Sequence, residues 1–205
     1  MNTKALRQKI LDLAIHGKLV PQDPNDEPAS VLLERIRAEK ERLIKEGKIK
    51  KPKKAKTTCD KPHYPYQLPE GWVWTTLENI SNDITDFVAS GSFAALRENV
   101  KYYSNKEYAI LVRTKDFQNN FTKDLVYTDK HGYDFLSNSN LHGGELILPN
   151  IGASIGKVFI VPSLDIPMTL APNSIMVRFF DDKLKEYLYY FFQSPYGQNI
   201  LASIS

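Results

Sequence analysis

The sequence contains little cysteine and no long apolar run. Of its 205 residues only Cys59 is a cysteine, so the chain cannot form an intramolecular disulfide and a reducing compartment is expected. No apolar stretch is long enough for a signal peptide or a membrane span. A hydrophobic content of 42% is nevertheless enough to bury a sizeable core. The sequence therefore predicts a globular cytoplasmic protein without a membrane partner.

Patterns that carry catalytic chemistry are also missing. The four histidines are scattered, and neither an HExxH motif nor paired cysteines provide the spacing of a metal site. There is no G-x-S-x-G turn, and Cys59 lies among lysines, a poor setting for a preorganised nucleophile. No glycine-rich dinucleotide loop opens a helix. We therefore expect no catalytic residue, no metal site and no cofactor in this chain.

Positive charge is concentrated in one segment. Residues 35–56 contain eleven Lys or Arg against three Glu, whereas residues 57–205 contain twelve basic and sixteen acidic side chains. The second region is slightly acidic, so it could bind nucleic acid only through a local basic face placed against phosphates.

Two amphipathic helices are expected near the N-terminus. Residues 3–16 predict the first, which ends at Gly17. Pro28 opens the second, which ends at Gly47. On the first helix the expected apolar face consists of Leu6, Ile10, Leu13 and Ala14. We interpret residues 1–47 as a helical hairpin that docks on a partner rather than a solvated one, and residues 48–63 as a basic linker.

From Tyr64 onward aromatic residues and strand formers dominate. A turn at Pro69 and Gly71 leads to an expected strand that carries Trp72 and Trp74, with at least one of them in the core. Further strands are expected at 108–112 and 173–180, and a helix at 184–193. The predicted fold class is α/β (α+β): the helical hairpin, a mixed strand-rich domain over 64–196 with a C-terminal helix, and the start of a further helical region over 197–205.

A glycine-rich loop offers the first candidate binding site. Two short apolar runs, 145–148 and 158–161, predict strands joined by a tight loop that holds Asn150, Ser154 and Lys157. Such a loop suits contact with phosphates or base edges. Only three residues separate Gly152 from Gly156, and Val158 follows the lysine, so the loop is no Walker A motif and ATP binding by this chain is not expected.

The second candidate site follows the strand at 108–112. Arginine can read guanine and asparagine can read adenine in the major groove, which makes Arg113, Lys115, Asn119 and Asn120 candidate DNA contacts together with Asn150, Ser154 and Lys157. An ordinary polar surface loop explains any one of the residues after the strand equally well.

Five segments in order resemble the specificity subunit of type I restriction-modification enzymes. These segments are LRQKILDLAIHGKLVPQDPNDEPASVLLERIRAEKERL, LPEGWVWTTLENI, LVRTKDF, IGASIGK and YLYYFFQSPYGQ. The resemblance implies that residues from about 72 to 196 form a target recognition domain and that the helices belong to a conserved spacer and docking region. It also implies a non-catalytic DNA-reading subunit that recognises one half of a bipartite site.

The expected partners follow from the same resemblance. They are double-stranded DNA, a modification (methyltransferase) subunit that uses S-adenosylmethionine, and a restriction (endonuclease) subunit that uses ATP and Mg. A full specificity subunit usually has two recognition domains, and this chain has room for one. A fragment is favoured over a half-subunit that self-associates. The alternative is a protein–protein interaction adaptor without DNA sequence specificity.

Overall fold

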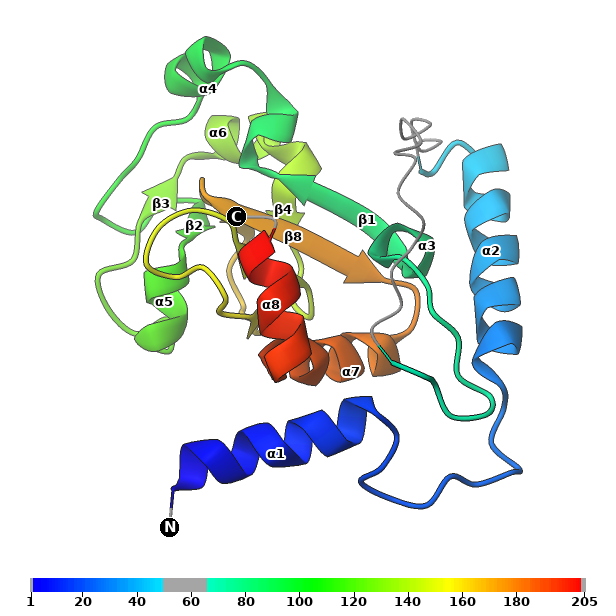
Figure 1. Cartoon of the computed structure of the whole chain (residues 1–205). Coiled ribbons are helices and arrows are strands. Elements are labelled where there is room, and N and C mark those ends of the chain that lie inside the picture. Colours follow the sequence, from blue (N-terminus) through cyan, green and yellow to red (C-terminus); the bar gives the residue numbers. More distant parts are fainter. Residues whose placement is uncertain (1, 50–65, 204–205) are drawn as a thin grey trace. The chain divides into compact units, whose positions relative to one another are not determined.

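The computed structural model describes residues 2–49 and 66–203 (Figure 1). Cys59 and most of the predicted basic linker over 48–63 lie outside these residues. The described chain falls into two compact units, Met1–Asn82 and Asp83–Ser205, and each is described by itself. Helices and two sheets are both present, so the predicted mixed α/β class is confirmed. The domain boundaries predicted after residues 47, 63 and 196 stay predictions.

The first unit is helical in its described part. Its helices are α1 (Thr3–Ile15), α2 (Ala29–Lys45) and the short α3 (Leu77–Ile80). Asn2 caps α1 by accepting the Ala5 backbone N–H at 3.1 Å, and Gly17 ends it with φ +65°, a value that glycine adopts without strain. Both predicted N-terminal helices are thus confirmed.

The expected apolar face of α1 is wrong in part. Leu6 and Ile10 are 45% and 42% exposed, whereas Leu11 and Ile15 are buried. Leucine and isoleucine occur at several angles around this helix, so spacing alone did not identify the buried side.

The predicted strand at Trp72 and Trp74 is also wrong. These residues belong to no strand of the described structure, and both Trp residues are half-buried rather than core. Trp72 Nε1 donates to Gln22 Oε1 at 2.9 Å, and the Trp74 ring lies 4.9 Å from the ring of Tyr66. Tyr66 in turn donates to the carbonyl of Ile15. Side-chain contacts with the end of α1, rather than a β-ladder, hold this segment.

The second unit contains both sheets, although strand β1 begins with the last two residues of the first unit. Its helical elements are η1 (Phe87–Ser90), α4 (Phe93–Asn99), α5 (Thr114–Gln118), α6 (Lys130–Phe135), η2 (Ser137–Ser139), α7 (Asp182–Gln193) and α8 (Pro195–Ser203). Its strands are β1 (Ser81–Asp86), β2 (Ala109–Val112), β3 (Tyr127–Thr128), β4 (Asn140–Leu141), β5 (Leu146–Pro149), β6 (Phe159–Ile160), β7 (Met168–Leu170) and β8 (Ser174–Phe179).

The strands form two four-stranded sheets with the orders β1-β8-β5-β6 and β3-β2-β7-β4. In the first sheet β5 pairs antiparallel with β6, with Leu146 opposite Ile160, which confirms the predicted hairpin around the glycine-rich loop. In the second sheet β2 and β7 are parallel neighbours, and the antiparallel strands β3 and β4 flank them. The carboxyl ends of β2 and β7 therefore meet at one edge.

Hydrophobic residues cover β2 on both faces. Successive side chains of a strand point to opposite sides, so Ile110 and Val112 join one core cluster and Leu111 joins another. The first cluster also holds Leu141, Ile147, Val161, Met168, Leu170 and Met176. The second also holds Phe87, Leu96, Val100, Leu136 and Ala171. Burial on both faces fixes β2, and hence the position of the residues that follow it.

Helices α7 and α8 close the second unit as a tight pair. The predicted helix over 184–193 is confirmed, and it begins slightly earlier, where Asp181 accepts the Lys183 backbone N–H at 2.8 Å. Gly197 of α8 is buried against α7, and a Cβ atom added to it would lie 2.1 Å from the carbonyl oxygen of Phe191. The two helix backbones therefore approach as closely as a glycine allows.

Candidate nucleic-acid interface

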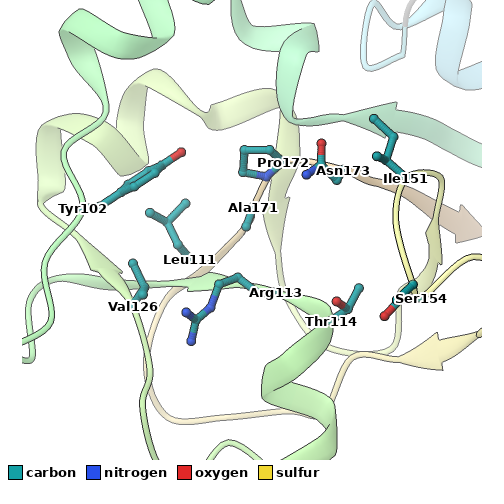
Figure 2. A pocket seen from close by; sticks show the side chains of 11 residues that line it. Tyr102, Leu111, Arg113, Thr114, Val126, Ile151, Ser154, Ala171, Pro172 and Asn173 are labelled. Atoms are coloured by element: carbon teal, nitrogen blue, oxygen red, sulfur yellow. The ribbon is translucent and has the colours of Figure 1, made fainter.

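A pocket lies where the parallel strands β2 and β7 end (Figure 2). It has a volume of about 430 Å³, and we call it the Arg113 pocket. Its lining consists of Tyr102, Leu111, Arg113, Thr114, Val126, Ile151, Ala153, Ser154, Ala171, Pro172 and Asn173. Ligand sites of α/β proteins commonly lie outside the carboxyl ends of adjacent parallel strands. The pocket thus lies at a place in the fold where a binding site is expected.

The pocket joins two stretches that the sequence marked separately. Arg113 and Thr114 follow β2, whereas Ile151, Ala153 and Ser154 belong to the glycine-rich loop between β5 and β6. Figure 2 shows Tyr102 at one end of the pocket and Ile151 and Ser154 at the other. Two of the predicted DNA contacts, Arg113 and Ser154, therefore line the same pocket.

Arg113 is held by contacts inside the domain. Its guanidinium donates to Asp116 at 2.7 and 3.2 Å and to the carbonyl oxygen of Asp124. Asp116 is fully buried and also accepts the Arg113 backbone N–H at 2.8 Å. A buried carboxylate requires a paired charge and hydrogen bonds, and Arg113 supplies both. The guanidinium thus stabilises the segment 113–124, while the Arg113 side chain remains 29% exposed and lines the pocket.

The other residues predicted after β2 lie outside the pocket lining. Lys115 is exposed on α5, with its ammonium 3.7 Å from the carboxylate of Asp124. Asn119 caps the C-terminus of α5, and its carbonyl accepts the hydroxyl of Thr122 at 2.6 Å. Asn120 has φ +49°, a left-handed conformation that asparagine tolerates better than most residues. Lys115 on α5 and the polar residues Asn119 and Asn120 just after it therefore follow Arg113 closely in the chain.

The glycine-rich loop is shaped by two turns of its own backbone. The N–H of Ile155 donates to the carbonyl of Gly152, and that of Lys157 donates to the carbonyl of Ser154. Gly152 and Gly156 have φ +85° and +82°. Ile151 is 61% exposed, and Lys157 is exposed as well. The loop therefore presents backbone, a hydroxyl and an ammonium to a partner.

Asn150 lies at the base of the loop, outside the pocket lining. Its backbone N–H donates to the carbonyl of Asn173 at 3.2 Å, while its side-chain Oδ1 is buried without a hydrogen-bond partner among the described residues. Buried polar atoms without a partner are rare in folded proteins. Of the seven predicted contacts, Arg113 and Ser154 line the same pocket. The other five lie within seven residues of one of these two in the chain: Lys115, Asn119, Asn120, Asn150 and Lys157.

Sequence reasoning missed Tyr102 and Asn173 as members of the site. Tyr102 is 58% exposed, and its hydroxyl can donate a hydrogen bond at the rim of the pocket. Asn173 has φ +71° between β7 and β8. The Pro-Asn pair at 172–173, just before β8, was a usable turn signal for Asn173, whereas Tyr102 carried no comparable signal.

The described residues contain neither a metal-binding cluster nor a membrane-spanning helix. Within residues 2–49 and 66–203 no group of three or more His, Cys, Asp or Glu side chains could hold a metal ion. No helix in this part of the chain combines the length and the apolar character that a membrane span requires.

Comparison with known proteins indicates the class of protein. No protein-family profile matches the chain. Curated relatives at 45–51% identity are specificity subunits of type I restriction enzymes, which confirms the resemblance found in the sequence motifs.

Two particular relatives come from Escherichia coli. The chain is 45% identical over 125 residues to the type I restriction enzyme EcoAI specificity subunit, an alignment that covers 58% of this chain and 21% of the relative. It is 51% identical over 98 residues to the EcoEI specificity subunit, covering 45% of this chain and 16% of the relative. The aligned part thus spans about a fifth of the length of these relatives.

Proposed function

We propose that this chain is a non-catalytic DNA-reading part of a type I restriction-modification specificity subunit. The observation that carries the proposal is its 45–51% identity to two such subunits. The geometry supports it, because the glycine-rich loop and the residues after β2 converge on the Arg113 pocket. In this proposal the chain selects a sequence, and the chemistry takes place on partner subunits.

The contacts with DNA divide into two kinds. Lys115 and Lys157 are exposed, so their ammonium groups can reach phosphates. Contacts with phosphates fix the position of a protein on DNA without reading the base sequence. Hydroxyl and amide groups of the kind that read base edges belong to Ser154, Asn119, Asn120 and Asn150. Arg113 holds the segment that presents Lys115, Asn119 and Asn120, because its guanidinium is paired with Asp116.

The N-terminal helices form the docking part of the proposal. Leu6 and Ile10 lie four residues apart on α1 and both expose apolar surface. Apolar side chains exposed together are typical of protein interfaces. We propose a modification subunit, which holds S-adenosylmethionine, as their partner. A restriction subunit would supply the ATP- and Mg-dependent cleavage, and a second recognition domain, or a second copy of this chain, would read the other half of a bipartite site.

The proposal is tested by expressing the chain with a candidate modification subunit and a second recognition domain, and mapping N6-methyladenine across a plasmid library. Methylation at one defined motif is the expected result. The matched variant pair is Ser154→Ala, expected to relax the motif, and Lys157→Ala, expected to lower methylation at all sites alike. A complex that forms and contains a second recognition domain, yet methylates no motif, would refute DNA reading and favour the adaptor function.

A further inference from the structure

One side chain fastens the glycine-rich loop to the C-terminal helices. Gln198 of α8 donates from Nε2 to the carbonyl oxygen of Gly156 at 2.7 Å and to that of Phe192 in α7 at 2.6 Å. An amide nitrogen carries two hydrogens, so both bonds form at once. The two loop turns, by contrast, join loop backbone to loop backbone. Gln198 is therefore a tie between the loop and a different part of the domain.

Gly156 is fitted to this glutamine. A Cβ atom added at Gly156 would lie 2.8 Å from Gln198 Oε1, closer than Cβ atoms occur in proteins. Gly152 has nearly the same positive φ, but an added Cβ would meet nothing within 4 Å. The two loop glycines thus serve different purposes. Gly152 supplies only a left-handed backbone, whereas Gly156 also leaves the space that the Gln198 amide occupies.

The other end of the tie is rigid. The backbone N–H of Gln198 donates to the carbonyl of Ser194 at 2.9 Å, inside the first turn of α8. Gly197, within this turn, and Leu201, the next turn along α8, are both buried. Helix α8 therefore holds Gln198 in one place, and Gln198 transmits that position to Gly156.

We propose that Gln198 is a positioning residue for sequence reading. This inference rests on the proposed function. By holding Gly156, Gln198 fixes the loop so that Ser154 lines the Arg113 pocket and Lys157 faces outward. Without the tie the loop keeps its lysine, so attraction to phosphates persists. What is lost is the fixed direction of the hydroxyl and the loop backbone toward base edges, because readout requires defined geometry.

The first test measures amide hydrogen exchange in the full chain. Gln198→Ala removes both hydrogen bonds that Nε2 donates, including the one to the Gly156 carbonyl, so exchange of the amides in 152–157 should rise about fivefold or more. The control is Asn199→Ala, an exposed amide on the same helix. Exchange in β2 and β7 should stay as in the wild type, which shows that the domain is folded. Equal loop exchange in Gln198→Ala and wild type would overturn the proposal.

The second test uses the glycine pair and a pool of random-sequence duplex DNA. Gly156→Ala and Gly152→Ala impose the same backbone strain, but only the first clashes with Gln198. Gly156→Ala should therefore reduce sequence enrichment several-fold more than Gly152→Ala, and this difference should vanish in the Gln198→Ala background. Binding to the unselected pool should stay within about twofold of wild type. Equal effects of the two glycine variants in the wild-type background would overturn the proposal.

Failure of the proposed function gives a different result. A wild-type chain that enriches no sequence from the duplex pool refutes DNA reading, and with it the recognition part of this inference. The exchange rates of 152–157 still decide whether Gln198 holds the loop.

Discussion

Removing the Arg113 guanidinium should destabilise the domain as well as affect DNA recognition. In Arg113→Ala the carboxylate of Asp116, which is fully buried in the wild type, loses its ion pair and two hydrogen bonds from the guanidinium. Breaking a buried pair by deleting one partner costs about 3 to 5 kcal/mol. The Arg113 side chain is 29% exposed, and the backbone N–H still donates to Asp116, so the expected cost lies near the lower end, about 3 kcal/mol.

Urea denaturation of the full chain, followed by circular dichroism, measures this cost. Lys115→Ala is the matched control, because its ion pair with Asp124 is exposed and should contribute less than about 1 kcal/mol. The double variant Arg113→Ala, Asp116→Ala removes the stranded charge and should recover at least about 1 kcal/mol relative to Arg113→Ala. A cost below about 1 kcal/mol for Arg113→Ala, or no recovery in the double variant, would refute the structural assignment of Arg113.

Three further predictions concern packing, capping and phosphate contact. Gly197→Ala should lower the free energy of unfolding by about 2 kcal/mol in denaturation experiments, because the alanine Cβ would meet the Phe191 carbonyl. Helix propensity alone predicts a gain in stability, so a more stable variant would contradict this packing. Hydrogen bonds from the backbone N–H of Gly132 and the Tyr103 hydroxyl lower the pKa of Asp129. The stability that Asp129 contributes to the fold is therefore present above the ordinary carboxyl pKa and is lost as the pH falls through the lowered value. Asp129→Ala should therefore cost about 1 kcal/mol at neutral pH and little in acid, and a pH-independent cost would contradict this. Lys157→Ala should reduce the slope of log affinity against log salt by about 1 with all duplexes alike, and an unchanged slope would show that Lys157 contacts no phosphate.

Local sequence patterns predicted the elements whose signals are local. The helix of residues 3–16 is predicted to end at Gly17, and the structure contains α1 over Thr3–Ile15 with Gly17 just after it in a left-handed conformation. The β5–β6 hairpin was identified from two short apolar runs around glycines, and its antiparallel register is observed. In these cases the interactions that define the element lie within a few residues of each other.

The errors have a non-local origin. Trp72 and Trp74 alternate like strand residues, but their rings contact Gln22 and Tyr66 instead of a neighbouring strand. The parallel pairing of β2 with β7 joins Ile110 to Met168, residues far apart in the chain that share no local signal. Because this pairing creates the pocket, the sequence identified both of its polar stretches without showing that they meet, and it gave no sign of Tyr102. The pairing of Arg113 with Asp116 was likewise not anticipated, although a carboxylate three residues after an arginine was visible.

The most direct measurement of the central claim is selection of bound duplexes from a random-sequence DNA pool by the full chain, repeated at increasing salt concentration. The account predicts enrichment of one short motif, affinity that falls steeply with salt, and loss of enrichment in Ser154→Ala with little change in binding to the unselected pool. Binding without any enriched motif, or no duplex binding by a folded chain that still associates with a modification subunit, would contradict the claim that this domain reads DNA sequence.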